Sequence, residues 1–118
     1  MTKILVVDDS AFMRKILTGI LQKAGYNEVC EASDGDEAVD VFLQQKPDVT
    51  LLDIIMPHSG IEALSEILSK SAAAKVIMIT AVGQEGIMKE TMDIGAIDYI
   101  IKPFREEKVI AAVRRALS

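Results

Sequence analysis

The sequence lacks the features of a disulfide scaffold, a membrane protein or a nucleic-acid-binding protein. A single cysteine, Cys30, rules out an internal disulfide, and we expect this thiol to fill a buried or edge position, with a reactive thiol as the alternative. No apolar run approaches the ~20 residues of a membrane span, and the residues after Met1 lack the long apolar region of a signal peptide. Acidic residues outnumber basic ones by 18 to 13, and no basic stripe is present to contact a phosphate backbone. We therefore expect a cytoplasmic protein with neither a nucleic-acid nor a membrane partner.

Two familiar binding motifs are also missing. The first apolar run leads into Asp8-Asp9-Ser10 and not into a glycine-rich turn, which argues against a dinucleotide-binding domain. The one histidine, His58, has no His, Cys or acidic residue at metal-ligand spacing, so we interpret it as an ordinary loop residue.

Strand-length apolar runs alternate along the chain with segments whose apolar residues recur at intervals of three and four. The runs cover residues 4–7, 28–32, 49–52, 76–80 and 97–101. The first helix is expected to place an apolar stripe from Met13 to Ala24, before Gly25, and the others to cover residues 36–45, 61–70, 87–94 and 106–117. This alternation predicts one α/β domain over residues 1–118, with a five-stranded parallel sheet and helices on both of its faces.

Three aspartates follow two of the predicted strands directly. Asp8 and Asp9 come after residues 4–7, and Asp53 comes after residues 49–52. If these strands are parallel neighbours roughly 4.8 Å apart, their carboxylates converge at the edge of the sheet where ligands of such folds bind. Mg²⁺ prefers oxygen ligands and usually binds through one or two carboxylates, waters and a substrate phosphate. The pattern therefore predicts a magnesium site and phosphoryl chemistry at this edge.

Each of these residues alone also has a simpler interpretation. An acid pair after a strand is often a helix N-cap with a solvated neighbour, and Thr80 or Lys102 alone would be an ordinary strand-end residue. Asp53 alone favours a function, because an unpaired buried carboxylate is costly. The joint pattern is more informative, since these polar residues end four separate runs.

Together these residues resemble the receiver domain of two-component response regulators over essentially the whole chain. The matching motifs are Asp8-Asp9, Asp53 followed by Met56-Pro57, Thr80 followed by Ala81, and Lys102-Pro103. The stretch Val7-Asp8-Asp9-Ser10-Ala11-Phe12-Met13-Arg14, with no output domain attached, is most similar to the family's single-domain chemotaxis regulators. The resemblance implies a flavodoxin-like strand order 2-1-3-4-5 and a monomeric switch that is not an enzyme.

The resemblance gives each site residue a role. Asp53 would accept a phosphoryl group from a chemotaxis-type histidine kinase, while Thr80 and Lys102 would contact phosphoryl oxygens. The implied Mg²⁺ ligands are Asp9, Asp53, the backbone carbonyl of Ile55 and, through a water molecule, Asp8. In this family the peptide bond that matches Lys102-Pro103 is cis.

The resemblance also implies an output surface. Tyr99 matches the family's aromatic switch, whose ring moves when the hydroxyl residue is drawn toward the phosphoryl group. The surface of the fourth helix, fifth strand and fifth helix would then carry the signal, with Met88, Tyr99 and Ile101 as apolar contacts. A flagellar motor switch or adaptor protein is the implied partner, and the alternative is a half-buried edge tyrosine without a switching role.

The sequence departs from the family in the turn after Asp53. Met-Pro at positions 56–57 is followed by only two residues before Gly60, so the turn is one residue short and lacks its apolar anchor. This leaves the start of the third helix open. Gly86 also weakens the fourth helix by up to ~1 kcal/mol relative to alanine.

Two positions predict a slow loss of the phosphoryl group. In the family, the residues that match Ile55 and Val82 flank the path of the attacking water. Both are branched and apolar here and cannot orient that water. We therefore expect a long-lived phosphorylated state and a separate phosphatase among the partners.

Two other classes of function stay open. A magnesium-dependent phosphatase also uses an aspartate after a buried strand, but such enzymes place a second acid two residues later, where this chain has Ile55. A receiver-like interaction module that is never phosphorylated is the other alternative, and the intact set of five polar residues argues against it.

Overall fold

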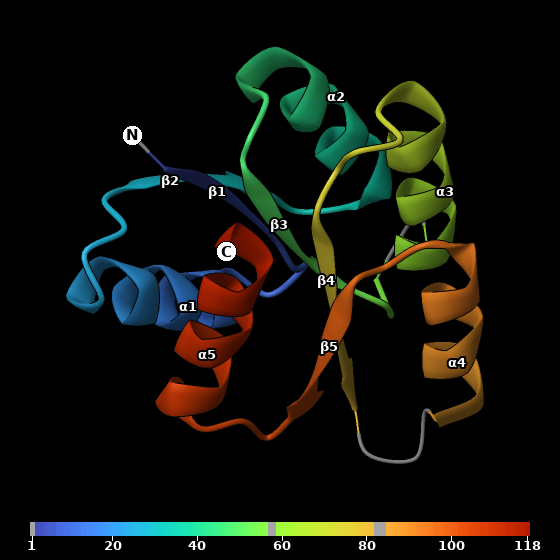
Figure 1. Ribbon diagram of the computed structural model, residues 1–118. Helices are drawn as coiled ribbons and strands as arrows, with labels where there is room; N and C mark the ends of the chain where they lie inside the picture. Colours follow the sequence, from blue (N-terminus) through green and yellow to red (C-terminus); the bar gives the residue numbers. More distant parts are fainter. Residues whose placement is uncertain (1, 57–58, 82–84) are drawn as a thin grey trace.

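The computed structural model describes residues 2–56, 59–81 and 85–118. Five strands alternate with five helices (Figure 1). The strands are β1 (Lys3–Val7), β2 (Glu28–Ala32), β3 (Val49–Asp53), β4 (Val76–Ala81) and β5 (Asp98–Lys102). The helices are α1 (Ala11–Lys23), α2 (Gly35–Gln45), α3 (Gly60–Lys70), α4 (Glu85–Ile94) and α5 (Glu106–Leu117). In this part of the chain no helix is both long and apolar enough to cross a membrane.

The strands form one parallel sheet in the order β2-β1-β3-β4-β5. The chain moves outward from β1 to β2 and then returns past β1 to β3, so the direction of winding reverses between β1 and β3. Ligands of open α/β sheets bind outside the carboxyl ends of the strands at such a reversal. The flavodoxin-like fold predicted from the sequence is confirmed, and Asp8, Asp9 and Asp53 lie at this reversal.

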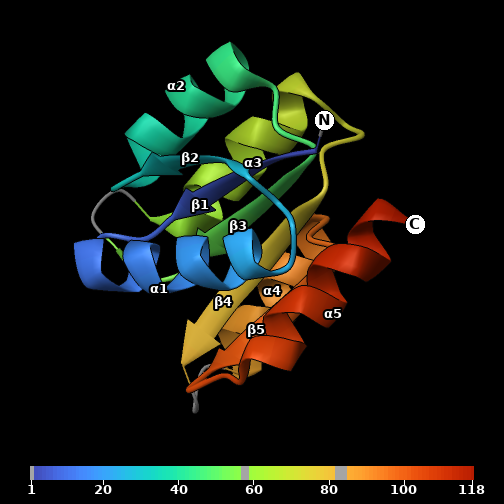
Figure 2. The ribbon, with the colours of Figure 1, turned by 90° about the vertical axis from the view of Figure 1, so that its left-hand side faces the viewer.

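Helices cover both faces of the sheet, with α1 and α5 on one face and α2, α3 and α4 on the other (Figures 1 and 2). Successive side chains of a strand point to opposite faces. On β1, Ile4 and Val6 therefore pack with the core beneath α1 and α5, whereas Leu5 and Val7 pack with the core on the other side. All four are fully buried, which explains why the strands read as continuous apolar runs and not as alternating ones.

Side-chain caps define the starts of α1 and α2. The Ser10 hydroxyl accepts a hydrogen bond from the backbone N–H of Met13 at 3.2 Å, and the Asp34 carboxylate accepts one from Glu37 at 2.8 Å. The helices and strands begin and end within two residues of the predicted positions. The largest difference is at α4, which starts at Glu85 and not at residue 87, because periodicity of apolar residues does not mark a polar first turn.

The structure also gives the start of the third helix, which the short turn had left open. Helix α3 begins at Gly60, and the Ser59 hydroxyl accepts a hydrogen bond from the Ile61 N–H at 3.1 Å. The Gly60 N–H donates to the Ile54 carbonyl at 3.1 Å, so the helix starts directly against the end of β3. A Cβ at position 60 would contact the Asp53 carbonyl oxygen and would lie 2.9 Å from Ile54 Cα, which leaves no room for a side chain.

Cys30 is half-buried on the edge strand β2, and its Sγ lies 3.6 Å from the Ile4 carbonyl oxygen. Burial raises the pKa of this thiol, and a higher pKa lowers the fraction of reactive thiolate. This environment favours the interpretation of Cys30 as a packing residue.

Candidate functional site at the carboxyl edge of the sheet

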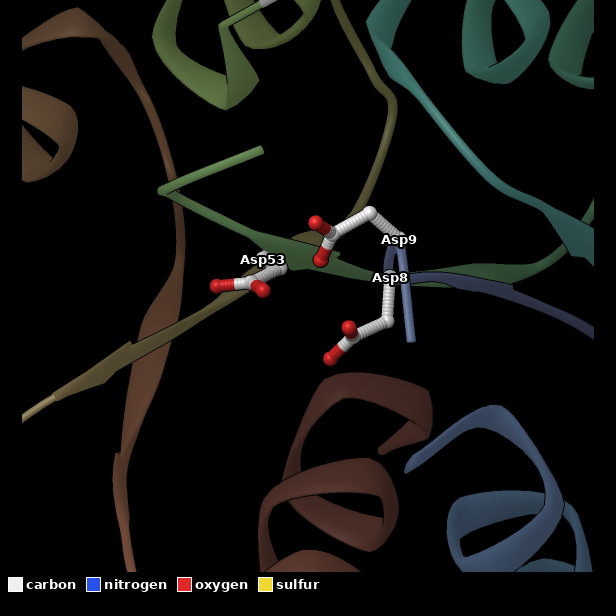
Figure 3. Close-up of side chains that lie close together, drawn as sticks. All are labelled: Asp8, Asp9 and Asp53. Carbon is white, nitrogen blue, oxygen red and sulfur yellow. The ribbon is translucent and has the colours of Figure 1, made fainter. Parts of the chain in front are cut away.

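The strand register brings the three aspartates together. Val7, the last residue of β1, pairs with Leu52 of β3, so the next residues, Asp8 and Asp53, leave the two strands at the same level. One carboxylate oxygen from each of Asp8, Asp9 and Asp53 lies within 4.8 Å of the other two. Figure 3 shows the three side chains close together. The predicted convergence of these carboxylates is therefore present in the fold.

The three carboxylates differ in exposure and in partners. Asp8 and Asp53 are buried, with 1% and 7% of their surfaces exposed, whereas Asp9 is exposed. Both oxygens of Asp8 are engaged, because Oδ1 accepts from the Ser10 N–H at 2.9 Å and Oδ2 pairs with Lys102. Asp9 forms no hydrogen bond or ion pair within residues 2–56, 59–81 and 85–118, so its oxygens are available to a ligand.

Lys102 supplies the positive charge of the site. From the last residue of β5, its Nζ lies 3.0 Å from Asp8 Oδ2 and 3.4 Å from Asp53 Oδ2. Burial alone would lower the pKa of Lys102, but the hydrogen bond to Asp8 and the attraction of both carboxylates outweigh it and raise the pKa. Lys102 is therefore a fixed cation that bridges two of the three acids. The Lys102–Pro103 peptide bond is cis.

The site changes the pKa of Asp53. Its pKa is raised from the usual 3.8 to about 6: burial raises it most, the nearby charge of Lys102 opposes this, and repulsion from Asp8 adds to it. A cation beside these carboxylates would offset both the burial and the repulsion. The donor set is composed only of oxygen atoms, which suits a hard divalent cation.

Ile55 and Thr80 border the cluster. The Ile55 N–H approaches Asp53 Oδ1 at 3.4 Å, so the chain bends back beside the acid, and the Ile55 side chain is 58% exposed. Thr80 is buried and pairs with Ile101, one row beyond Asp53 in the sheet. Its hydroxyl donates only a long hydrogen bond of 3.4 Å, to the Ala81 carbonyl, and a hydroxyl so weakly held can turn to a new acceptor.

The residues of the predicted output surface lie on β5 and α4. Tyr99 and Ile101 alternate with inward-facing Ile100 on the edge strand β5 and are 39% and 41% exposed. Met88 is half-buried on α4. Three other residues named from the sequence, Pro57, His58 and Val82, lie outside the residues that the structure describes.

One site residue was not found from the sequence. The Arg14 Nη1 donates to the Asp8 carbonyl oxygen at 2.7 Å, and its Nε pairs with Glu31 Oε1 at 3.1 Å. The position of Arg14 in a predicted helix did not indicate a role in the site, because an arginine on a helix is ordinarily solvated. Only the fold shows that Glu31, 17 residues later, lies within its reach.

The model of the response regulator receiver domain family matches residues 4–114, which is most of the chain. The chain belongs to this family. Receiver domains are signalling switches of two-component systems and not classical enzymes.

Relatives match this receiver domain over almost its full length. The protein CcdB of Bacillus subtilis is 47% identical over 118 residues, covering 99% of this chain and 98% of its own. The chemotaxis protein CheY of Listeria monocytogenes is 43% identical over 117 residues, covering 98% of each chain. A crystal structure of the CheX–CheY–BeF3–Mg complex from Borrelia burgdorferi superimposes with a TM-score of 0.94 at 38% identity, covering 99% of this chain and 90% of the other.

Proposed function

We propose that residues 1–118 act as one receiver domain that is switched on by phosphorylation of Asp53 in the presence of Mg²⁺. The observation that carries this proposal is the meeting of three carboxylates within 4.8 Å of one another, with Lys102 bridging Asp8 and Asp53. A cluster held by one lysine keeps excess negative charge at the place where a phosphoryl group would bind. A further cation would neutralise this excess charge. The same cation would stabilise the negative charge on the oxygens of a transferred phosphoryl group.

Asp53 is the proposed nucleophile. Its carboxylate is ionised at neutral pH, because even the raised pKa of about 6 lies below 7. One of its oxygens attacks the phosphorus of a phosphohistidine on a histidine kinase, the P–N bond breaks with its electron pair leaving on the imidazole, and an acyl phosphate forms. Asp53 is suited to this step because it lies at the end of a rigid buried strand, which fixes its direction of attack.

Other residues of the chain stabilise and read the phosphoryl group. Asp9, Asp53 and the Ile55 carbonyl are the proposed direct ligands of Mg²⁺. Asp8 would act through water, because its two oxygens hold partners at 2.9 and 3.0 Å, whereas both contacts of Asp53 are longer, at 3.4 Å. The bound ion supplies positive charge for the transferred oxygens. Lys102 exchanges part of its contact with the acids for one phosphoryl oxygen, and the weakly held Thr80 hydroxyl donates to another.

We propose that the signal serves chemotaxis and passes through α4, β5 and α5 to a flagellar motor switch or adaptor protein. Tyr99 and Ile101 expose apolar surface on the edge strand, and Met88 adds to it from α4. Relatives named chemotaxis protein CheY support the process, and the Borrelia complex supports a protein partner for a regulator of this size. A chemotaxis-type histidine kinase would be the donor.

The test is phosphorylation of the intact protein by a small phosphodonor such as acetyl phosphate. We expect the mass to increase by one phosphoryl group in Mg²⁺, and to stay unchanged when the metal is chelated. Asp53→Asn should stay unmodified because an amide oxygen is a poor nucleophile.

The matched control is Asp48→Asn, which alters an acid at the opposite end of the sheet, hydrogen-bonded to the Lys3 N–H at 2.8 Å. This variant should be phosphorylated like the wild type. Labelling of Asp53→Asn to the wild-type level would overturn the assignment, and a wild-type protein that accepts no phosphoryl group would favour an interaction module instead.

A further inference from the structure

Arg14 connects the acid pair to the edge of the sheet. It lies on α1, and its side chain is only 18% exposed although it carries a full charge. One arm of the guanidinium donates to the Asp8 carbonyl oxygen at 2.7 Å, a short charge-assisted hydrogen bond, while Nε pairs with Glu31 on β2 at 3.1 Å. Lysine could not make both contacts, because its donors share one nitrogen atom.

The hydrogen bond to Asp8 acts on the peptide that joins Asp8 to Asp9. A peptide unit is planar, so fixing the carbonyl oxygen of Asp8 also fixes the N–H and Cα of Asp9. The next peptide, which joins Asp9 to Ser10, is held by the Ser10 N–H, which donates to Asp8 Oδ1 at 2.9 Å. Neither the N–H and C=O of Asp9 nor its carboxylate forms a hydrogen bond in the described part of the chain. The direction of the exposed carboxylate therefore depends on the two peptides that flank Asp9, and Arg14 holds the first of them.

We infer that Arg14, oriented by Glu31, is a positioning residue that aims the Asp9 carboxylate at the cation. The inference rests on the proposed magnesium site and extends it beyond the three acids. Groups that orient metal ligands without touching the metal typically change metal affinity by about 10- to 100-fold when they are removed.

The charge of Arg14 and its proposed positioning role predict opposite effects of its removal on Mg²⁺ affinity, and a binding measurement can therefore test the inference. Arg14 is a cation beside a cation site, so Coulomb repulsion alone predicts that Arg14→Gln binds Mg²⁺ more tightly. Loss of positioning predicts weaker binding. We expect isothermal titration calorimetry to show a dissociation constant for Mg²⁺ about tenfold higher in Arg14→Gln than in the wild type. The constant should also be higher in Arg14→Lys, which keeps the charge but lacks the two separate N–H donors of the guanidinium.

Two controls separate position from charge. Arg115→Gln removes the same charge from a similar ion pair, Nη2 to Asp98 Oδ2 at 2.9 Å, on β5 and α5, and should bind Mg²⁺ like the wild type. Glu31→Gln and Glu31→Ala lose the same charge, but only Gln retains an oxygen acceptor for Nε. We therefore expect Glu31→Gln to bind Mg²⁺ more tightly than Glu31→Ala does.

A measurement on the metal-free protein tests the inference separately from the metal site. The backbone amide NMR signal of Asp9 should shift or broaden in Arg14→Gln and stay in place in Arg115→Gln. Equal or tighter Mg²⁺ binding by Arg14→Gln, relative to Arg115→Gln, would overturn the positioning role. If the wild type binds no Mg²⁺, the proposed site is wrong, and an unchanged Asp9 signal in Arg14→Gln would then overturn the role of Arg14 independently.

Discussion

The fold buries Asp53 in an environment that disfavours its ionised form. The free energy of unfolding of the metal-free protein should therefore depend on the protonation of Asp53. Burial raises its pKa from 3.8 to about 6, so between these values the folded state binds more protons than the unfolded state. The contribution of Asp53 to stability therefore falls as pH rises from about 4 to about 6 and stays low above that range.

We predict that Asp53→Asn removes this contribution. With a chelator present, the variant should be more stable than the wild type at pH 7.5, by up to about 3 kcal/mol for a shift of about two pKa units, and the difference should shrink toward pH 4. Urea unfolding across this pH range measures it. A difference that does not change with pH would show that the Asp53 carboxyl is not perturbed by the fold.

We also expect the side chain at position 55, an isoleucine here, to affect the lifetime of the proposed phosphorylated state. The backbone N–H of Ile55 lies 3.4 Å from Asp53 Oδ1, and its exposed apolar side chain cannot hydrogen-bond a water that approaches the phosphorus. Ile55→Asn should accelerate loss of the phosphoryl group by about tenfold, which corresponds to roughly 1.4 kcal/mol of the barrier, because a polar group can orient this water.

The decay of the intact mass after removal of the phosphodonor measures this rate. Leu43→Asn, a matched change at an exposed leucine on α2, should decay like the wild type. Equal decay in Ile55→Asn and Leu43→Asn would mean that position 55 does not control the water.

At the scale of elements, helix α3 starts in close contact with the end of β3, beside the site. Gly60 meets the backbone of Asp53 and Ile54, and backbone atoms cannot move aside as a side chain can. Gly60→Ala should therefore push the start of α3 away from the strand, reduce stability by about 1–3 kcal/mol and slow phosphorylation of Asp53.

Gly19→Ala is the matched control for this change. Gly19 lies inside α1 with nothing within 4 Å of an added Cβ, so alanine there should stabilise the protein by about 0.5–1 kcal/mol. Thermal unfolding and the phosphorylation rate, measured on both variants, separate crowding at Gly60 from a general effect of alanine. Normal stability and a normal rate in Gly60→Ala would contradict the close contact.

The elements also show what the sequence could and could not predict. Helix α5 was predicted with its exact bounds, because a strong apolar stripe follows a polar loop. The convergence of Asp8 and Asp53 was predicted because parallel strands end at the same edge. The contact of Gly60 with β3 and the reach of Arg14 to Glu31 could not be predicted, since both depend on distances across the fold that periodicity does not contain.

At the scale of the whole molecule, β5 joins the site to the predicted output surface. The pairing of β4 with β5 places Thr80 beside Ile101 and Ala81 beside Lys102. Tyr99 lies three residues before Lys102 on the same strand, half-exposed at the edge of the sheet. The proposed shift of Lys102 and Thr80 toward a phosphoryl group would therefore act on β5, the strand that carries Tyr99, directly through Lys102 and through the pairing of Thr80 with Ile101.

We predict that phosphorylation shifts the ring NMR signals of Tyr99 and that Lys102→Ala abolishes this response. The variant should still unfold cooperatively and bind Mg²⁺, because the acids remain. Lys70→Ala, at an exposed lysine in the last turn of α3, should keep the response. A normal Tyr99 response in Lys102→Ala would show that the signal does not pass through the lysine.

The ammonium of Lys102, which contacts Asp8 and Asp53, is a tethered counter-ion at a high effective concentration. A free cation that enters the cluster competes with it, so affinity for the free ion is lower than three unpaired acids would give. We therefore expect that cation to dissociate readily, so that the fraction of occupied sites depends on the concentration of the cation in solution. In the proposed cycle, the lysine is still tethered beside the acids when the phosphoryl group leaves, and we expect it to return to them and restore the resting state.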